Sequence, residues 1–170
     1  LQLASGVRHF WDLREGLRMN AAIEHLNVID GSAAPARAVS VGVDYSAHPL
    51  WRASTRLEHR RSGDIASTPD NDRFNTTLWT GMVARKLDRD WTLLGRNHLL
   101  ATKYAARGDV LQNRAQVGAA YRDTDRNRMN ALGKLEYKLE RDASNSSRDA
   151  SNADVGELKS RAWIASAHAD

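Results

Sequence analysis

The stretch RAVSVGVDYSAHPLWRASTRLEHRR, residues 37–61, decides the fold because apolar and polar residues alternate on both sides of Pro49. The apolar set is Val39, Val41, Val43 and Tyr45 before Pro49, and Trp51, Ala53, Thr55 and Leu57 after it. Side chains two residues apart share one face of a β-strand. The stretch therefore predicts two long antiparallel strands, each with one apolar and one polar face, joined by a turn at 47–50.

The same period of two recurs at 17–25, 111–122 and 129–139. Each run is about 10 to 13 residues long, whereas a strand of a globular protein usually has about 5 or 6. A bilayer is crossed by a tilted strand of about 9 to 11 residues, which fits these runs better. We expect nine strands in the chain, the last over 158–169.

The predicted fold class is all-β: an up-and-down antiparallel transmembrane β-barrel, or an incomplete segment of one. Short turns are expected at 14–16, 47–50, 88–90 and 123–126, and longer polar loops at 30–36, 62–72, 105–109 and 141–157. The last loop contains the pentapeptide RDASN twice. Bacterial single-chain barrels have an even number of strands, so nine predicts that residues 1–170 are one segment of a larger barrel protein.

Composition excludes several other classes. The chain has no cysteine, and its longest apolar runs are about four residues, far short of the roughly 20 that a transmembrane helix needs. The net charge is +4, and Arg outnumbers Lys 20 to 5, without the Lys clusters that suit a nucleic-acid-binding tail. We expect no nucleic-acid partner.

Aromatic residues support a membrane location. Those beside the predicted short turns are expected to form a girdle at one membrane–water interface. They are Trp11, Tyr45, Trp51, Trp91 and Tyr121. Trp79 and Trp163 lie further from the turns and fit a girdle less well.

Charged residues on the polar faces are expected to point into the interior of the barrel. They are Arg18, Glu24, Asp44, Arg52, Arg56, Glu58, Arg114, Lys134 and Glu136. Hairpin geometry predicts three pairs of opposite charge, namely Asp12 with Arg18, Asp44 with Arg52, and Arg114 with Glu136. An Arg-lined lumen would favour anions, but the interleaved acids favour an interior whose charges satisfy one another.

Residues 75–87 and 91–101 resist a clean assignment. The face that carries Gly81, Val83 and Leu93 also carries Arg85 and Asn97. Arg85 can reach toward the interface, whereas Asn97 lies near the middle of its predicted strand. Two explanations remain open: the register shifts at a bulge, or this part of the face does not meet lipid.

Catalysis and metal binding have little support. The turns 88–90 and 123–125 are rich in Asp but lack the Gly and distal Glu of a calcium loop, and Asp is common in turns. The six histidines form no helical metal pair, and His25 and His59 fall on apolar faces near the longer loops. No serine is marked as activated and no phosphate-binding glycine loop occurs, so we expect no enzyme, no metal and no cofactor.

Four segments carry a resemblance to a known class of proteins: LRMNAAIEHLNVIDG, AVSVGVDYSAHPLWRASTRLEHR, ARKLDRDWTLLGRN and QVGAAYRDTDRNRMNALGKLEYK. Their strand–turn–strand cadence resembles the C-terminal β-barrel region of large proteobacterial outer-membrane proteins. The resemblance implies a location in the bacterial outer membrane, with lipid and lipopolysaccharide as partners. Barrels of this class follow large extracellular or periplasmic regions, so the remainder of the chain or neighbouring barrel strands are further expected partners.

Three functions are compatible with these patterns. The first is a barrel wall that anchors a larger exported protein in the membrane. The second is a transport pore, porin-like or polypeptide-conducting, with an Arg-rich lumen. The third is a soluble β-sandwich or adhesin module, which the small Ala, Gly and Thr residues on the apolar faces disfavour because a packed core needs closer complementarity.

Overall fold

The computed structural model describes residues 2–28, 35–63, 73–105, 107–126, 128–143 and 158–170. These residues form strands joined by turns, with no helix among them. The strands are β1 (Gln2–Arg14), β2 (Leu17–Val28), β3 (Ala36–Tyr45), β4 (Trp51–Ser62), β5 (Phe74–Lys86), β6 (Trp91–Tyr104), β7 (Val110–Arg122), β8 (Asn130–Asp142) and β9 (Leu158–Ala169). Within the described ranges there is accordingly no apolar helix of membrane-spanning length.

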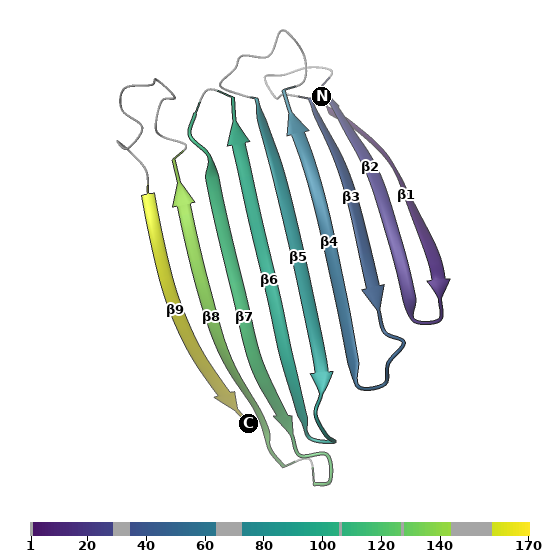
Figure 1. The fold of residues 1–170 in the computed structure, drawn as a ribbon, viewed down its shortest axis with the longest axis vertical. Coiled ribbons are helices and arrows are strands. Elements are labelled where there is room, and N and C mark those ends of the chain that lie inside the picture. The colour runs from purple at the N-terminus through teal and green to yellow at the C-terminus, as the bar shows by residue number, and fades with distance from the viewer. Residues whose placement is uncertain (1, 29–34, 64–72, 106, 127, 144–157) are drawn as a thin grey trace.

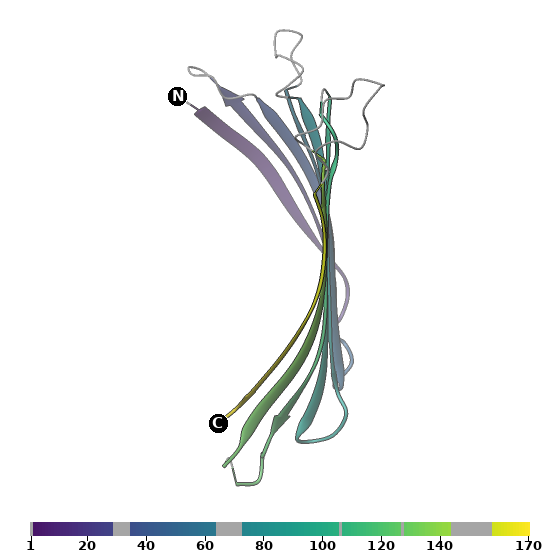
Figure 2. The ribbon, with the colours of Figure 1, turned by 90° about the vertical axis from the view of Figure 1, so that its left-hand side faces the viewer.

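All nine strands belong to one sheet in the order of the chain, and each is antiparallel to the next (Figure 1). This confirms the predicted all-β, up-and-down antiparallel arrangement. The sheet is twisted and curved when it is seen edge-on (Figure 2). It is open, because β1 pairs only with β2 and β9 only with β8.

Strand register divides the side chains between two faces. Partners are both even-numbered or both odd-numbered in every pairing, as in Asp44 with Ser54 and Val41 with Leu57. The exception is Arg14 with Leu17, at an irregularity in β1. Partners across a ladder point to the same side of the sheet. We call the two sides the even face and the odd face, after the strand residues whose side chains they carry.

Burial on the two faces is the reverse of that in a soluble protein. Buried residues of the described strands lie on the even face and are small, polar or charged; they include Ala22, Ala38, Ser40, Ser62, Thr102 and Glu136. Most large apolar strand residues lie exposed on the odd face, including Val7, Ile23, Val39, Leu57 and Val117. No large side chain among the described residues is fully buried. The sheet by itself therefore has no hydrophobic core.

The connections lie at two ends of the sheet, which we call the turn end and the loop end. The turn end holds the β1–β2, β3–β4, β5–β6 and β7–β8 connections, and the loop end holds the other four. Gly16 at the turn end has φ 68°, and a Cβ there would overlap the backbone of Ala47. A side chain at this position would be strained and would clash.

The predicted alternation of short and long connections is only partly correct. The β6–β7 connection at the loop end spans 105–109, whereas the β7–β8 connection at the turn end spans 123–129 and is the longer of the two. The predicted loops over 30–36, 62–72 and 141–157, with both RDASN pentapeptides, lie mainly outside the described residues.

Candidate functional site

The structure places every residue predicted for the interior on the even face: Arg18, Glu24, Asp44, Arg52, Arg56, Glu58, Arg114, Lys134 and Glu136. A hollow of about 540 Å³ on this face is bordered by residues of six strands, from Arg8 of β1 to Arg96 of β6. Side chains from six adjacent strands converge on one hollow only where the sheet is concave. The even face is therefore the concave side of the curved sheet.

Glu136 of β8 is the centre of the best-enclosed charge cluster on the even face. It is 2% exposed and accepts hydrogen bonds from Arg114 Nε at 2.5 Å and Arg114 Nη2 at 3.0 Å. Gln116 Nε2 donates to it at 2.7 Å, and Lys134 Nζ lies 3.7 Å away. Two cations and an amide thus surround one carboxylate, which compensates its removal from water. The predicted Arg114–Glu136 pair is confirmed.

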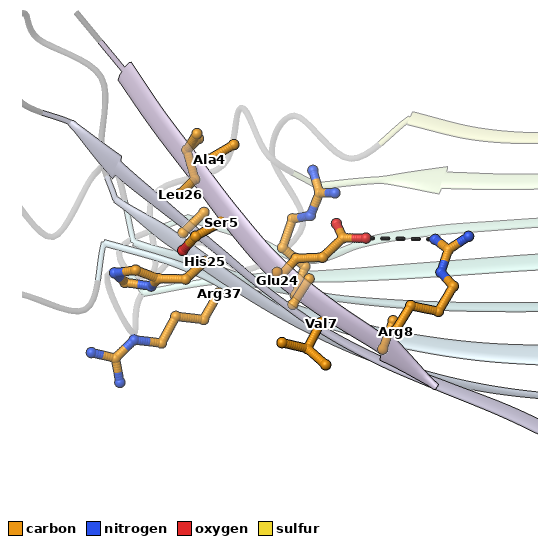
Figure 3. A pocket seen from close by; sticks show the side chains of 13 residues that line it. Ala4, Ser5, Val7, Arg8, Glu24, His25, Leu26 and Arg37 are labelled. Atoms are coloured by element: carbon orange, nitrogen blue, oxygen red, sulfur yellow. Dashed lines mark ion pairs between the residues drawn. The ribbon is translucent and has the colours of Figure 1, made fainter. Parts of the chain in front are cut away.

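Other ion pairs on the even face are more open to solvent. Arg18 Nε donates to Asp12 at 2.8 Å, as predicted from the hairpin. Arg8 of β1 lies 3.8 Å from Glu24 of β2, and Figure 3 shows both side chains on the same side of the sheet. Exposed pairs of this kind contribute little to stability individually.

Glu58 of β4 joins two arginines of its own strand. Arg56 Nη2 lies 3.3 Å from Glu58 and also 3.3 Å from the Ser40 hydroxyl, while Arg60 lies 3.5 Å from Glu58. Because residues two apart in a strand share a face, one carboxylate can serve both guanidinium groups. The cluster is a second example of self-pairing on the even face.

The predicted pair of Asp44 with Arg52 is wrong in register. Asp44 lies opposite Ser54 on β4 and opposite Arg18 on β2. The ladder between β3 and β4 ends at Tyr45 with Ala53, so Arg52 extends beyond the last residue of β3. A tight hairpin would have placed Arg52 beside Asp44, and the asymmetric connection at 46–50 prevents this.

Two arginines on the even face stand apart from these pairs. Arg52 lies opposite Ala84, and Arg96 lies between Met82 and Gln116 and borders the 540 Å³ hollow. Neither makes an ion pair with any residue that the structure describes. Lys86 and Arg122, at the turn end of the same face, likewise make no ion pair with a described residue, so Arg52 and Arg96 are two of several cations there that are available to a passing anion.

The five predicted girdle residues all lie on the odd face, near the turn end. Tyr45 and Trp51 have ring centroids 4.6 Å apart, and those of Trp91 and Tyr121 are 5.1 Å apart. Trp11 packs against His9 at 4.6 Å. The aromatic residues therefore form clusters across neighbouring strands at one end of the apolar face.

Trp79 and Trp163 lie on the same face, closer to the middle of their strands. Trp79 Nε1 donates to the Thr55 hydroxyl at 2.9 Å, which satisfies the indole N–H within the sheet. Trp163 packs against Tyr137 at 4.8 Å. The polar tip of Trp79 therefore has an internal partner without reaching either end of the strand.

The pairing of β5 with β6 excludes a register shift as the explanation for the position of Asn97. The register is continuous from Phe74–Tyr104 to Lys86–Thr92, so no bulge shifts the faces. Asn97 lies on the odd face and donates through Nδ2 to Asn113 Oδ1 of β7 at 3.1 Å. Its own Oδ1 is buried and accepts no hydrogen bond. Asn97 is therefore a polar residue with an unsatisfied acceptor among the apolar residues of the odd face.

The aspartates of the turns have structural partners. Asp88 accepts backbone N–H groups of Asp90 at 2.8 Å and Trp91 at 2.7 Å, and Asp123 accepts those of Asp125 and Arg126. Such side-chain-to-backbone bonds are the reason that Asp favours turns. Within the described ranges, no group of three or more His, Cys, Asp or Glu could hold a metal ion.

The two turns also contact each other. Asp90 Oδ1 accepts the Thr124 hydroxyl at 2.6 Å and the Thr124 N–H at 3.1 Å, and Arg89 pairs with Asp125 at 2.6 Å. The bonds from Thr124, with a smaller effect of Arg89, lower the pKa of Asp90 below its ordinary value of 3.8. The carboxylate is therefore stabilised in its charged form.

Sequence reasoning missed three features of the odd face: the Asn97–Asn113 pair, the Trp79–Thr55 bond, and a row of basic residues at the loop end. The first two join residues that are 16 and 24 positions apart, so they depend on registers that alternation within single strands does not give. The third was visible as odd-numbered Arg and Lys residues near the ends of the predicted strands. Comparison with known proteins found neither a protein family whose pattern matches this chain nor a matching curated protein.

Proposed function

We propose that this chain forms part of the wall of a β-barrel in the bacterial outer membrane and anchors a larger exported protein there. The observation that carries the proposal is the reversal of the two faces. Large apolar side chains are exposed on the odd face, while the buried and ion-paired groups gather on the concave even face. The odd face is stable in lipid, whereas in water it would expose a large contiguous apolar surface to solvent.

The length of the strands fits a membrane. On β4, the odd face runs from the aromatic Trp51 at the turn end, through apolar positions as far as Leu57, to the cation Arg61 at the loop end. Ten residue steps at about 3.3 Å span roughly 33 Å along the strand. With a tilt of about 40°, Arg61 lies about 25 Å from Trp51 along the membrane normal, so the strand reaches across an apolar band of about 25 Å, the height found in outer-membrane barrels.

The open edges of the sheet define what the proposal still requires. In lipid, each backbone N–H and C=O needs a hydrogen-bond partner, so a sheet in a membrane has to close. Here β1 and β9 each have one unpaired edge. We infer that further strands, from the remainder of the chain or from neighbouring barrel strands, pair with these edges.

Neighbouring residues on β4 give a direct test, because Arg56 and Leu57 lie at nearly the same depth on opposite faces. The sequence has no cysteine, so Arg56→Cys and Leu57→Cys can each carry one spin label in the full-length protein reconstituted in lipid vesicles. We expect the label at 57 to collide mainly with oxygen dissolved in lipid and the label at 56 mainly with a water-soluble nickel complex. Equal exposure of both labels to the nickel complex would favour the soluble module instead.

A transport pore is the second candidate, favoured by Arg52 and Arg96, which have no acidic partner among the described residues. Cations that line a lumen select for anions. Conductance of the full-length protein in planar bilayers separates the two functions. A large, anion-selective conductance that Arg96→Glu reverses without changing thermal stability supports the pore, and absence of conductance supports the anchor.

A further inference from the structure

Acidic residues are distributed unevenly across the sheet. Each of the strands β1 to β4 contains one acidic residue, whereas β5, β6, β7 and β9 contain none. In the second half of the sheet, the carboxylates of the strands all belong to β8: Glu136, Glu140 and Asp142. Among the described strands from β5 to β9, a cation on β6 or β7 therefore finds a carboxylate on β8 alone.

A hollow of about 380 Å³ lies on the even face of β6, β7 and β8. The even-face side chains that line it all carry N–H donors: Arg96, His98, Gln112, Arg114, Gln116 and Lys138. The register brings them together, because Arg114 lies opposite both His98 and Lys138. None of the described residues that line the hollow is acidic. We call this hollow the donor hollow.

The neighbouring carboxylates of β8 already have partners. Glu136 accepts two hydrogen bonds from Arg114 and is 2% exposed, so it is closed off from solvent. Glu140 lies 3.2 Å from Lys138 and accepts a hydrogen bond from Gln112 at 3.1 Å. The side chains of Arg114 and Lys138 are nevertheless about half exposed. Because a guanidinium has five N–H groups and an ammonium three, both cations keep donors for a further acceptor.

Arg96 and His98 of β6 differ from these residues. Neither forms a hydrogen bond or an ion pair with a residue that the structure describes. Arg96 is exposed and His98 is half-buried. Beside them, Arg114 and Lys138 lie directly opposite each other, and like charges in that position repel. An anion in the donor hollow would reduce this repulsion and give the two side chains of β6 an acceptor.

We propose that the donor hollow binds a phosphate group, either as free phosphate or on a small molecule. A phosphate monoester carries about two negative charges and three strong acceptor oxygens. It can accept hydrogen bonds from donors on three strands, whereas a planar carboxylate is matched by the fork of one guanidinium. The volume of the hollow lies in the range of small-molecule sites, so there is room for a carrier such as a sugar. The inference goes beyond the proposed anchoring role and does not depend on lipid at the odd face.

Isothermal titration calorimetry of the folded full-length protein in detergent tests the site, in phosphate-free buffer at constant ionic strength. The titrants are glucose 6-phosphate, inorganic phosphate and gluconate, which pairs a polyol chain with a carboxylate. We expect saturable binding of glucose 6-phosphate, with gluconate at least about tenfold weaker because it offers fewer charge-assisted hydrogen bonds. Inorganic phosphate that binds as tightly as glucose 6-phosphate would support the site and identify the free ion as sufficient.

Arg96→Gln should raise the Kd for glucose 6-phosphate at least about tenfold, and His98→Gln should raise it less, since the histidine is not a fixed charge. Neither change should lower the melting temperature, because neither side chain bonds to a described residue. Arg52→Gln is the matched control. Arg52 is an even-face cation that also has no partner among the described residues, but it lies outside the hollow. This variant should bind like the unmodified protein.

Three results would overturn the phosphate site. They are the absence of saturable binding of either phosphate, equal affinity for gluconate, and an equal loss of affinity in Arg96→Gln and Arg52→Gln. The last result would mean that the overall positive charge of the even face attracts anions without a defined site. None of the three bears on the anchoring role, which the spin labels at positions 56 and 57 test separately.

Discussion

Glu136 and Asn97 are polar residues near the middle of their strands, β8 and β6 of the same sheet, yet their surroundings differ. Glu136, on the even face, is 2% exposed and accepts three hydrogen bonds from Arg114 and Gln116. Asn97, on the odd face, donates one bond to Asn113, and its buried Oδ1 accepts none. The carboxylate of Glu136 therefore has donors around it on the even face, whereas the carbonyl oxygen of Asn97 has none on the odd face.

This difference shows which face is built to hold polar groups. Arg114 lies directly opposite Lys138, an unfavourable pairing that Glu136 offsets from the neighbouring position. Gln116 Nε2 donates a further hydrogen bond to the carboxylate of Glu136. Around Asn97, the cross-strand partners are Gly81 and Ala115, which offer no side-chain hydrogen bond. Glu136 is thus part of a hydrogen-bond network on the even face, whereas Asn97 on the odd face bonds to the side chain of Asn113 alone among the described residues.

The largest expected effect comes from removing the centre of the network. Glu136→Ala leaves the Arg114 guanidinium, the Gln116 amide and the Lys134 ammonium without their shared acceptor. Breaking an enclosed pair from one side costs more than the pair contributes, so we expect the melting temperature of the full-length protein to fall by roughly 5–10 °C. Anion permeability, if there is any, should change less than stability.

Glu140→Ala is the control for this prediction. Glu140 lies on the same strand and face and contacts Gln112 at 3.1 Å and Lys138 at 3.2 Å, but its side chain is 25% exposed, against 3% for Glu136. Water can replace its partners, so the fall should be clearly smaller. An equal fall in melting temperature in both variants would show that the burial of Glu136 does not add to its contribution to stability.

The second prediction has the opposite sign. Replacing both amides of the odd-face pair, in Asn97→Leu/Asn113→Leu, removes a buried acceptor that has no donor. If lipid surrounds this face, the free energy of unfolding in vesicles should rise by about 1–2 kcal/mol, because an unsatisfied amide in an apolar environment is costly. Urea unfolding of the reconstituted protein, followed by tryptophan fluorescence, measures the change.

Gln112→Leu provides the matching amide on the even face. It loses a hydrogen bond to Glu140, so it should destabilise the protein. The comparison fails if the odd-face double variant is destabilised as much as Gln112→Leu, since the two faces would then treat polar groups alike.

The sequence predicted the fold well because alternation within each strand is a local property. Val41 and Leu57 were expected on one face and Arg56 on the other, and the register places them so. The Asp44–Arg52 pair was missed because the position of the last ladder partner depends on the conformation of residues 46–50. Asn97 remained ambiguous because its partner Asn113 belongs to β7, and alternation within residues 75–87 and 91–101 does not reveal the register with that strand.

The closure of the sheet and its surroundings could not be predicted with the same certainty, for a physical reason. Alternation indicates that the two faces meet different environments. It does not tell lipid from a second protein layer, because both favour apolar residues. The described strands form one sheet and provide no second layer for the odd face. Its surroundings therefore have to be tested through the effects of substitutions on that face.

The smallest expected effect lies outside both faces, at the contact between the β5–β6 and β7–β8 turns. Asp90 accepts two hydrogen bonds from Thr124 there, but Thr124 is exposed and Asp90 is only half-buried, so Thr124→Ala should lower the melting temperature by only about 1 °C at neutral pH. The folded-state pKa of Asp90 is lowered, chiefly by the Thr124 hydroxyl, from its ordinary value of 3.8. The stabilising contribution of the Asp90–Thr124 contact is therefore complete above about pH 3.8 and is lost as the pH falls through the lower folded-state pKa.

Melting curves of the unmodified protein and of Thr124→Ala should converge at low pH. Thr124→Ser, which keeps the hydroxyl, should follow the unmodified protein. A difference that widens on acidification would mean that the bond favours the protonated carboxyl, contrary to the geometry of the turn.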